Sequence, residues 1–327
     1  MGAWAVCPEC TFTTVTSSAN PSIIGQSVTF TATVVPQPPQ TGTATGSVSF
    51  SDGVTTIGSG ILNAGGVATF STSALAAGSH TIAGHYSGDD NWLASNGSMT
   101  GNPQVVTINT TTAVTSSLNP SVLGQQVTFT ATVSPVAPGT GTPTGSVDFS
   151  DGVTVIGSGI LTGGIATLST SVLAVGSHTM TTTYAGDGTF NGSSGSLTGN
   201  PQVVNKASST TTVSTDCMTK FVELQPFTLS ATVSGASPTG SVTFSDGGGV
   251  LCSNVALSAG IATCTSSVLA VGGLDTETPY SLNASYGGDG NNTASASVSP
   301  LVITVLSAAD VVFRNGFEPQ SLSCPIE

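Results

Sequence analysis

Positively charged side chains are almost absent from this chain. Only three of its 327 residues are Lys or Arg, against 16 Asp or Glu, and the first of the three is Lys206. A protein that binds nucleic acid needs a basic surface to neutralise phosphates, and attraction to an anionic membrane surface needs the same charge. We therefore expect no nucleic-acid partner and no electrostatic binding to membranes.

Long hydrophobic runs are also lacking. A membrane-spanning helix needs about 20 consecutive apolar residues, and the chain has no such run, so we expect no membrane insertion. The first ten residues, MGAWAVCPEC, have neither the basic region nor the long apolar stretch of a signal peptide. Because the rest of the composition is typical of extracellular or cell-surface proteins, we expect either an isolated segment or the C-terminal part of a longer secreted protein.

Charged residues make up only 6% of the chain, whereas hydrophobic residues make up 38%. Disordered chains show the opposite balance of low hydrophobicity and high charge, so this chain has enough apolar residues to form cores. Ser, Thr, Gly and Asn supply the polar surface. Thr and Val fit the pleated surface of a sheet, and their abundance favours an all-β fold.

Three copies of one eight-residue segment reveal an internal repeat. The segment reads GSVSFSDG at 46–53, GSVDFSDG at 145–152 and GSVTFSDG at 240–247. Other blocks recur in the same order, among them YSGDD, YAGDG and YGGDG. The spacing predicts an N-terminal segment (1–10), three repeats (11–108, 109–205 and 206–305) and a C-terminal tail (306–327).

Each repeat shows the alternation of apolar and polar residues that is typical of strands. In the first repeat Val28, Phe30 and Ala32 share one face of a segment, and Thr residues occupy the other. The SDG that ends the eight-residue segment predicts a turn, because Asp bonds nearby backbone groups and Gly accepts positive φ. Short strands at this density predict a β-sandwich. The seven expected strands of the first repeat are 12–17, 26–35, 46–51, 55–62, 66–73, 79–87 and 98–108.

The recurring pattern GSVxFSDG, GxAT, GSHT and YxGD resembles the bacterial immunoglobulin-like repeats that occur in tandem in secreted and surface proteins. The resemblance covers about 295 of the 327 residues. It implies a non-catalytic extracellular module, often a spacer or an adhesive stalk, and it implies no ligand. The third repeat departs most from the pattern in its first two strands, where Cys217, Lys220 and Glu223 appear.

The expected fold class is therefore all-β: three tandem immunoglobulin-like β-sandwiches of about seven strands each, arranged as an elongated rod, with a short C-terminal tail. The joints between repeats, at 103–117 and 201–214, are rich in Thr and Val and contain no Gly/Ser linker. Such joints are stiffer than Gly/Ser linkers, and for this reason we expect a semi-rigid rod.

The aspartate of each YxGD block is the best candidate for a metal site. Asp89, Asp187 and Asp289 could hold Ca²⁺ together with backbone carbonyls, or each could cap the backbone of a turn between the last two strands. Calcium usually needs several oxygen ligands, and the EF-hand spacing of such ligands is absent. The turn is the favoured interpretation, and we expect no cofactor.

Six cysteines in a chain of extracellular character predict disulfides. Alignment of the repeats places Cys252 at the position of Gly58, and Cys264 at that of Phe70. A Gly facing a large side chain has thus become a Cys facing a Cys. We expect Cys252 and Cys264 to be bonded to each other across a hairpin of adjacent strands.

The remaining cysteines give two further expected pairs. Cys217 follows the first strand of the third repeat, and Cys324 lies in the tail, so a bond between them would pin the tail over the end of the last sandwich. The alternatives are that Cys324 pairs with another chain or stays free. Cys7 and Cys10 are close enough in sequence for a local bridge, although free thiols are an alternative.

Recurring His and aromatic residues are interpreted as structural. His80 and His178 share one position of the repeat, and Tyr280 replaces them in the third repeat, which is not expected of a catalytic base. No nucleophile elbow surrounds any Ser, and we expect no catalytic residues. Trp92 could stack on a sugar, but a plug at the end of the sandwich is favoured, and the tyrosine of each YxGD block is assigned to the core.

The sequence favours a non-enzymatic extracellular stalk, structural or adhesive, that spaces or presents a partner at the cell surface. Two alternatives stay open: a subunit of an extracellular filament, joined by an added strand or by end contacts, and the accessory C-terminal region of a secreted hydrolase. A protein, a surface glycan or further copies of the chain itself all fit as the partner.

Overall fold

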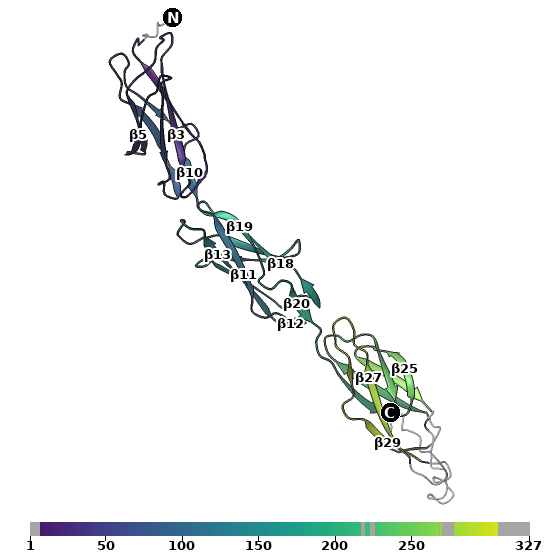
Figure 1. Ribbon diagram of the computed structural model, residues 1–327. Coiled ribbons are helices and arrows are strands. Elements are labelled where there is room, and N and C mark those ends of the chain that lie inside the picture. Colours follow the sequence, from purple (N-terminus) through teal and green to yellow (C-terminus); the bar gives the residue numbers. More distant parts are fainter. Residues whose placement is uncertain (1–6, 217–219, 223–225, 268, 270–277, 307–327) are drawn as a thin grey trace, which may run out of the picture. The chain divides into compact units, whose positions relative to one another are not determined.

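The structure is a computed structural model that describes residues 7–216, 220–222, 226–267, 269 and 278–306. This part of the chain is all-β and contains no helix. One set of sheets follows another along the sequence, one set for each repeat (Figure 1). The all-β prediction is therefore confirmed, and the rod-like arrangement of the repeats stays a prediction.

The first repeat forms sheets with the strand orders β1-β3-β6, β5-β4-β8-β9 and β2-β10-β7. Its strands are β1 (Thr11–Ser17), β2 (Ser22–Ile23), β3 (Val28–Pro36), β4 (Ser47–Asp52), β5 (Thr55–Ile61), β6 (Val67–Thr72), β7 (Gly78–His80), β8 (Ile82–Tyr86), β9 (Ser95–Ser98) and β10 (Gln104–Thr107). The expected strand 79–87 is split into β7 and β8. The expected last strand, 98–108, is shortened to β10, and β9 forms ahead of it.

The core of the first repeat lies between the sheets β1-β3-β6 and β5-β4-β8-β9. Strand β3 buries Val28, Phe30, Ala32 and Val34, and β4 buries Phe50. The rings of Phe30 and Phe50 come from opposite sheets, and their centroids are 6.5 Å apart. The alternation read from the sequence therefore assigns the inward faces of both strands correctly.

One open edge of the sandwich is closed by hydroxyl groups. Thr11 and Thr13 of β1 are buried, and both Oγ1 atoms lie 2.7 Å from Ser95 Oγ of β9. Because β1 and β9 belong to different sheets, these bonds join the sheets along the edge. The same hydroxyl cluster recurs as Thr110, Thr112 and Ser193, and as Ser209, Thr211 and Ser295.

Glycines let the opposite edge close. A Cβ on Gly60 of β5 would lie 2.4 Å from the carbonyl oxygen of Thr69 in β6, and a Cβ on Gly58 would lie 2.1 Å from the Phe70 ring. A Cβ on Gly157 of the second repeat would lie 2.7 Å from the Leu168 side chain. The close approach of the strands therefore requires glycine at these positions.

The second repeat has the corresponding sheets β11-β13-β16, β15-β14-β18-β19 and β12-β20-β17. The chain falls into two compact units, and the division passes through this repeat, so that 118–127 and 169–178 belong to the second unit. The strands are β11 (Thr110–Ser116), β12 (Ser121–Val122), β13 (Val127–Pro135), β14 (Ser146–Asp151), β15 (Thr154–Ile160), β16 (Ile165–Thr170), β17 (Gly176–His178), β18 (Met180–Gly186), β19 (Asn191–Ser196) and β20 (Gln202–Asn205).

The third repeat forms the sheet β21-β23-β26 and a second sheet of order β22-β29-β27-β24-β25, in which β28 also pairs with β27. Its strands are β21 (Thr210–Thr215), β22 (Lys220–Val222), β23 (Phe227–Ser234), β24 (Ser241–Ser245), β25 (Val250–Ala256), β26 (Ile261–Ser266), β27 (Thr278–Tyr286), β28 (Ser295–Ala296) and β29 (Leu301–Leu306). Its buried core includes Phe227, Phe244 and Tyr286.

A disulfide joins Cys252 and Cys264, with the Cα atoms 6.2 Å apart. The expected hairpin is wrong, because β25 pairs with β24 and β26 pairs with β23. The chain between Cys252 and Cys264 passes from one sheet to the other, so the bond links the two sheets at the edge where Gly58 meets Phe70 in the first repeat. Closure of a loop this short is worth roughly 2–3 kcal/mol in the chain-entropy treatment.

Cys7 and Cys10 form a second disulfide, with a Cα–Cα distance of 5.4 Å. Cys217 and Cys324 lie outside the described residues, as does the tail that follows Leu306. Their expected bond stays a prediction.

Candidate functional site

One aspartate joins two loops at the same end of each sandwich. In the first repeat Asp89 Oδ2 accepts hydrogen bonds from the backbone N–H and the hydroxyl of Thr45, at 2.7 and 2.6 Å. Its Oδ1 accepts bonds from the backbone N–H groups of Asn91 and Trp92, both at 2.8 Å. Asp89 therefore caps the backbone of its own loop and joins that loop to Thr45, two residues before β4 begins.

The same arrangement occurs in the other two repeats. Asp187 Oδ2 accepts from the N–H and the hydroxyl of Thr144 at 3.1 and 2.6 Å. Asp289 Oδ2 accepts from the same two groups of Thr239 at 2.7 and 2.9 Å. In both loops Oδ1 accepts from two backbone N–H groups that follow the aspartate. We call this arrangement the aspartate staple.

The staple occupies the acceptor sites that a cation would need. An ionised carboxylate offers about four lone-pair sites, and hydrogen-bond donors of the protein fill the sites of Asp89, Asp187 and Asp289. No group of three or more His, Cys, Asp or Glu side chains suited to a metal gathers in the part of the chain that the structure describes. The geometry supports the turn-capping interpretation of these residues over the calcium interpretation.

The hydrogen bonds lower the pKa of these carboxyl groups. The Thr45 hydroxyl, aided by three backbone N–H groups, holds the pKa of Asp89 well below its ordinary value, against the opposing effect of burial. Burial acts to raise the pKa of Asp187, but bonds from Thr144 and from the loop backbone outweigh it and lower the pKa to about 2. The pKa of Asp289 is likewise lowered, because its hydrogen bonds outweigh burial.

These lowered pKa values predict acid-labile loops. A carboxyl group whose folded pKa lies below its unfolded pKa of about 3.9 stabilises the fold fully above pH 4. That contribution disappears as the pH falls from about 4 to 2. We expect part of the circular dichroism change on acid titration to lie between about pH 4 and pH 2. Asp187→Asn should remove the part of this change that comes from the second repeat.

The matched control is Asp148→Asn, because Asp148 is exposed on β14 and outside the staple. It should leave the acid transition as in the wild type. Equal effects of the two substitutions would contradict the structural role of the staple.

The sequence analysis missed the threonine partner of the staple. Thr45, Thr144 and Thr239 each stand directly before the GSVxFSDG segment. The signal was present, because TGSV is common to all three repeats. The role of this threonine was missed because it bonds an aspartate in another loop, 44 residues away in the first repeat. Periodicity within one strand does not reveal such a contact.

The tyrosines of the YxGD blocks lie in the core, as expected. Tyr86, Tyr184 and Tyr286 are at most 1% exposed, and none of their hydroxyl oxygens makes a hydrogen bond of ordinary geometry. Burial, assisted by the nearby aspartate, raises the pKa of Tyr86 and of Tyr184 to about 12. These hydroxyls therefore stay protonated at neutral pH.

Trp92 and its counterparts plug the loop end of each sandwich. A Cβ on Gly42 would lie 2.7 Å from the Trp92 ring, and one on Gly141 would lie 3.0 Å from the Phe190 ring. Trp92 is half-buried and Phe190 is buried. This packing supports the plug interpretation over the sugar-stacking one.

The third repeat replaces the aromatic plug with a polar one. Asn292 is fully buried; its Nδ2 donates to Ala236 O at 3.0 Å and its Oδ1 accepts from Ala236 N at 2.7 Å. The loop that it meets, 235–240, is shorter than the corresponding loop 37–46 of the first repeat. An amide suits this place because the shorter loop presents the N–H and the carbonyl group of Ala236 to it.

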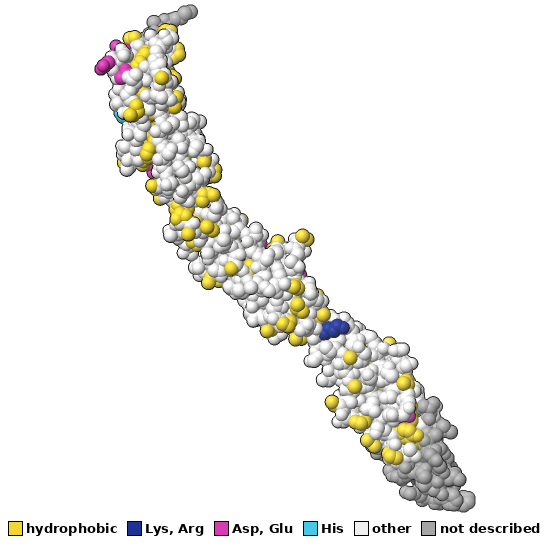
Figure 2. Space-filling model, in the orientation of Figure 1, with side chains coloured by type: hydrophobic (Ala, Val, Ile, Leu, Met, Phe, Trp, Pro, Cys, Tyr) yellow, Lys and Arg dark blue, Asp and Glu magenta, His cyan; other side chains and the backbone are white. Residues whose placement is uncertain are grey.

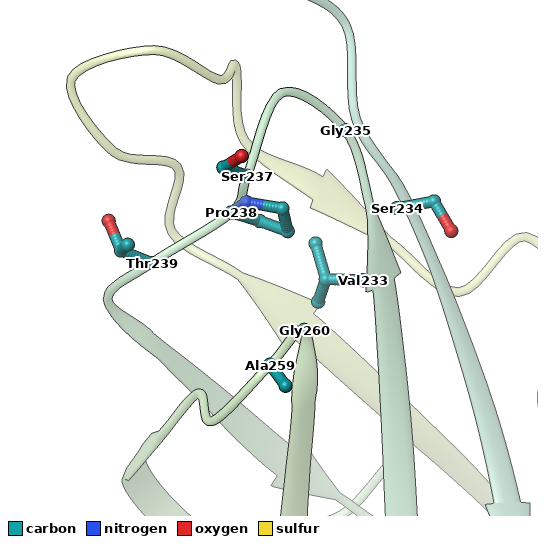
Figure 3. A pocket seen from close by; sticks show the side chains of 8 residues that line it. All are labelled: Val233, Ser234, Gly235, Ser237, Pro238, Thr239, Ala259 and Gly260. Carbon is teal, nitrogen blue, oxygen red and sulfur yellow. The ribbon is translucent and has the colours of Figure 1, made fainter.

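A hollow of about 630 Å³ lies beside this shorter loop (Figure 3). Val233, Pro238 and Gly260 form its apolar part, and Ser234, Ser237 and Thr239 contribute hydroxyls. The lining contains no titratable side chain.

The short second strand of each repeat and its last strand are parallel neighbours. β2 pairs with β10, β12 with β20, and β22 with β29. In the first repeat Asn20 reinforces this pairing: its Nδ2 donates to the carbonyls of Gly101 and Pro103, and its Oδ1 accepts from Val105 N, all at 2.9 Å.

Gln104 adds a buried amide to the same contact. Its Nε2 donates to Ala19 O at 2.9 Å and to Ser22 Oγ at 3.2 Å, and its Oε1 accepts from Ser17 Oγ at 2.6 Å. Asn119 and Gln202 make corresponding bonds in the second repeat. Asn20 with Gln104, and Asn119 with Gln202, are termed the terminal amide pairs. By register, Ile303 stands at the Gln104 position of the third repeat, because it pairs with Tyr280 as Gln104 pairs with His80.

The visible surface consists mainly of uncharged polar side chains and backbone, with scattered apolar side chains (Figure 2). This agrees with the charged fraction of 6%. No helix in the described part of the chain has the length and apolar character needed to span a membrane.

Each repeat has paired sheets, a core of Phe and Tyr, and a short second strand parallel to the last strand. These features define it as an immunoglobulin-like sandwich. The family described as Bacterial Ig-like domain (group 3) matches residues 15–109, 114–215 and 207–306. The chain belongs to this family, and the resemblance read from the recurring blocks is confirmed.

Several solved structures are similar to this chain. The titin I-band fragment I67–I69 is 13% identical, with 90% of this chain and 98% of that chain covered and a TM-score of 0.37. The three N-terminal domains of the bacteriophage RB49 Highly Immunogenic Outer Capsid protein are 15% identical (91% and 98% covered, TM-score 0.30). The mouse nectin-like molecule 4 ectodomain is 12% identical (91% and 99% covered, TM-score 0.33). No curated protein matches the chain.

Tandem bacterial Ig-like domains point to a structural or adhesive extracellular role. Disulfides such as Cys252–Cys264 are typical of extracellular proteins.

Proposed function

We propose that this chain is a non-enzymatic stalk, outside the cell or on its surface, that carries tension between an anchor and a presented partner. The observation that carries the proposal is the parallel pairing of the short second strand with the last strand in every repeat. A force applied to the two ends of a repeat pulls parallel neighbours in opposite directions. The hydrogen bonds between them are then loaded in shear together and do not open one by one.

The terminal amide pairs add side-chain bonds to this region in the first two repeats. Gln104 is fully buried, so water does not compete for its hydrogen bonds. Hydrogen bonds shielded in this way contribute more than exposed ones. Asn20 and Gln104 therefore strengthen the contact that a stretched chain would have to break first.

The joint between the first two repeats supports a stalk as well. Thr107 is paired within β10, and the next residue, Ile108, already forms a parallel bridge with Phe190. No free linker residue separates these pairings. A joint without slack transmits tension and is consistent with the stiffness expected from its composition.

A filament built by strand addition has less support. Strand addition needs an exposed sheet edge. In each sandwich the hydroxyl cluster joins the two sheets along one edge. At the other edge β5 closely approaches β6 in the first repeat, and a disulfide joins β25 to β26 in the third. A filament that grows through contacts between the ends of chains remains an alternative.

Single-molecule stretching of the full chain tests the proposal. We expect three separate unfolding events at high force, one for each repeat. Asn20→Ala should lower the unfolding force of one event. Asn63→Ala is the matched control, because Asn63 accepts two backbone hydrogen bonds in the β5–β6 turn, away from the terminal strands.

The control should lower thermal stability without a comparable loss of force. Equal loss of force from Asn20→Ala and Asn63→Ala would contradict the tension-bearing role. So would extension of all three repeats at low force without separate events.

A further inference from the structure

His80 is held between two hydrogen-bond acceptors. Its Nδ1 lies 2.6 Å from Asp52 Oδ2, and its Nε2 lies 2.8 Å from the carbonyl oxygen of Ala76. The side chain of His80 is only 12% exposed. The other carboxylate oxygen of Asp52 accepts from Thr81 N at 2.9 Å. The imidazole therefore lies in a fixed site between the end of β4 and the segment around β7.

Both neighbours of the ring can only accept. A neutral imidazole has only one N–H. Its other ring nitrogen would point a lone pair at the lone pair of an acceptor oxygen, which is unfavourable. The imidazolium form carries two N–H groups and satisfies both contacts. The geometry therefore fits protonated histidine.

In the second repeat His178 makes the carbonyl contact that His80 makes in the first. Its Nε2 lies 2.9 Å from Ala174 O, whereas that of His80 lies 2.8 Å from Ala76 O. The third repeat differs, because Tyr280 takes the histidine position and Asp246 caps its own turn at Gly248 and Gly249.

The histidines act at the strands that close each repeat. His80 is the last residue of β7 and pairs with Gln104 of β10, which in turn pairs with β2. His178 pairs with Gln202 in the same way. Since no Lys or Arg precedes Lys206, histidine is the only side chain able to carry positive charge in the first two repeats.

We propose that His80 is a pH-responsive clamp. When protonated, it holds the β7 segment against the end of β4 and supports the pairing of β10 with β7. When the proton is lost, one of the two ring contacts is lost and the segment is held less firmly. The first repeat is thus more stable in mildly acidic than in alkaline surroundings, whereas the third has no such dependence from this position.

The electrostatics agree with the geometry. Burial acts to lower the pKa of His80, but the hydrogen bond and the charge of Asp52 outweigh it and raise the pKa above its ordinary value. Asp52 is the titratable group whose charge acts on this ring. A raised folded pKa gives stability that is complete below the unfolded value of about 6.5 and is lost as the pH rises through the folded value.

The full chain allows a direct test, because it contains only three histidines. Their C2 proton resonances are assigned with His80→Gln, His85→Gln and His178→Gln and followed from pH 5 to 9. We expect the His80 resonance to titrate with a midpoint above about 6.5. Asp52→Asn, which removes the charged acceptor, should lower the His80 midpoint.

Thermal unfolding provides the second readout. The chain's two tryptophans, Trp4 and Trp92, both precede the second repeat, so tryptophan fluorescence reports on the first repeat alone. Its melting temperature should fall by several degrees between pH 6 and pH 8.5, and His80→Gln should flatten this dependence. His85→Gln is the control, because the His85 ring meets the Asn96 amide and no carboxylate.

A His80 midpoint at or below the ordinary value would overturn the proposal. The same holds for a pH dependence that is equal in the wild type and in His80→Gln. If His80→Gln does not fold, the His80 midpoint in Asp52→Asn decides: an unchanged midpoint overturns the proposal and a lower one supports it.

Discussion

Replacement of Phe50 by Ala is expected to destabilise the first sandwich by about 3–5 kcal/mol. Phe50 is fully buried and packs against rings from the opposite sheet, with centroid distances of 6.5 Å to Phe30 and 5.9 Å to Phe70. A domain of this size is stable by roughly 5–15 kcal/mol. The loss therefore brings the first repeat close to unfolding, and its tryptophan-detected transition should shift far toward lower denaturant.

Phe244→Ala makes the corresponding cavity in the third repeat, since Phe244 is also fully buried. It should change the circular dichroism transition but leave the tryptophan-detected transition in place. A shift of the tryptophan signal by Phe244→Ala as large as that by Phe50→Ala would mean that the repeats do not unfold separately.

The sequence was sufficient to predict which side chains of the strands face the core. Alternation with period two depends only on the geometry of an extended chain, so Val28, Phe30 and Phe50 could be assigned to the core without knowledge of their neighbours. Comparison of the repeats then supplied a long-range contact. A Gly opposite a Phe in one copy, and a Cys opposite a Cys in another, placed Cys252 next to Cys264.

The sequence was insufficient for contacts that depend on which sheet a strand joins. Nothing in the letters between Cys252 and Cys264 distinguishes a hairpin from a crossing between sheets, because both need the same short turn. The Asp89–Thr45 and His80–Asp52 bonds are similar cases. Each joins side chains from loops or strand ends far apart in sequence, where neither periodicity nor spacing indicates a partner.

The glycine of the YxGD block carries the other large expected effect. Gly88 has φ of 87°, a conformation that costs roughly 1–2 kcal/mol for a residue with a side chain. A Cβ there would also lie 2.8 Å from the carbonyl oxygen of Trp92, within the loop that Asp89 closes. We expect Gly88→Ala to lower the stability of the first repeat by about 2–4 kcal/mol, because backbone strain and overpacking add.

Gly101→Ala separates the two causes. Gly101 has a similar φ of 80°, but a Cβ there meets nothing within 4 Å, so this variant suffers the backbone strain alone. Tryptophan fluorescence reports on both substitutions, since both lie in the first repeat. The difference between their unfolding midpoints then measures the close approach of Gly88 to the Trp92 backbone. If the two variants lose equal stability, the loop can move away from a side chain at residue 88, and the aspartate staple does not hold it as tightly as its hydrogen bonds imply.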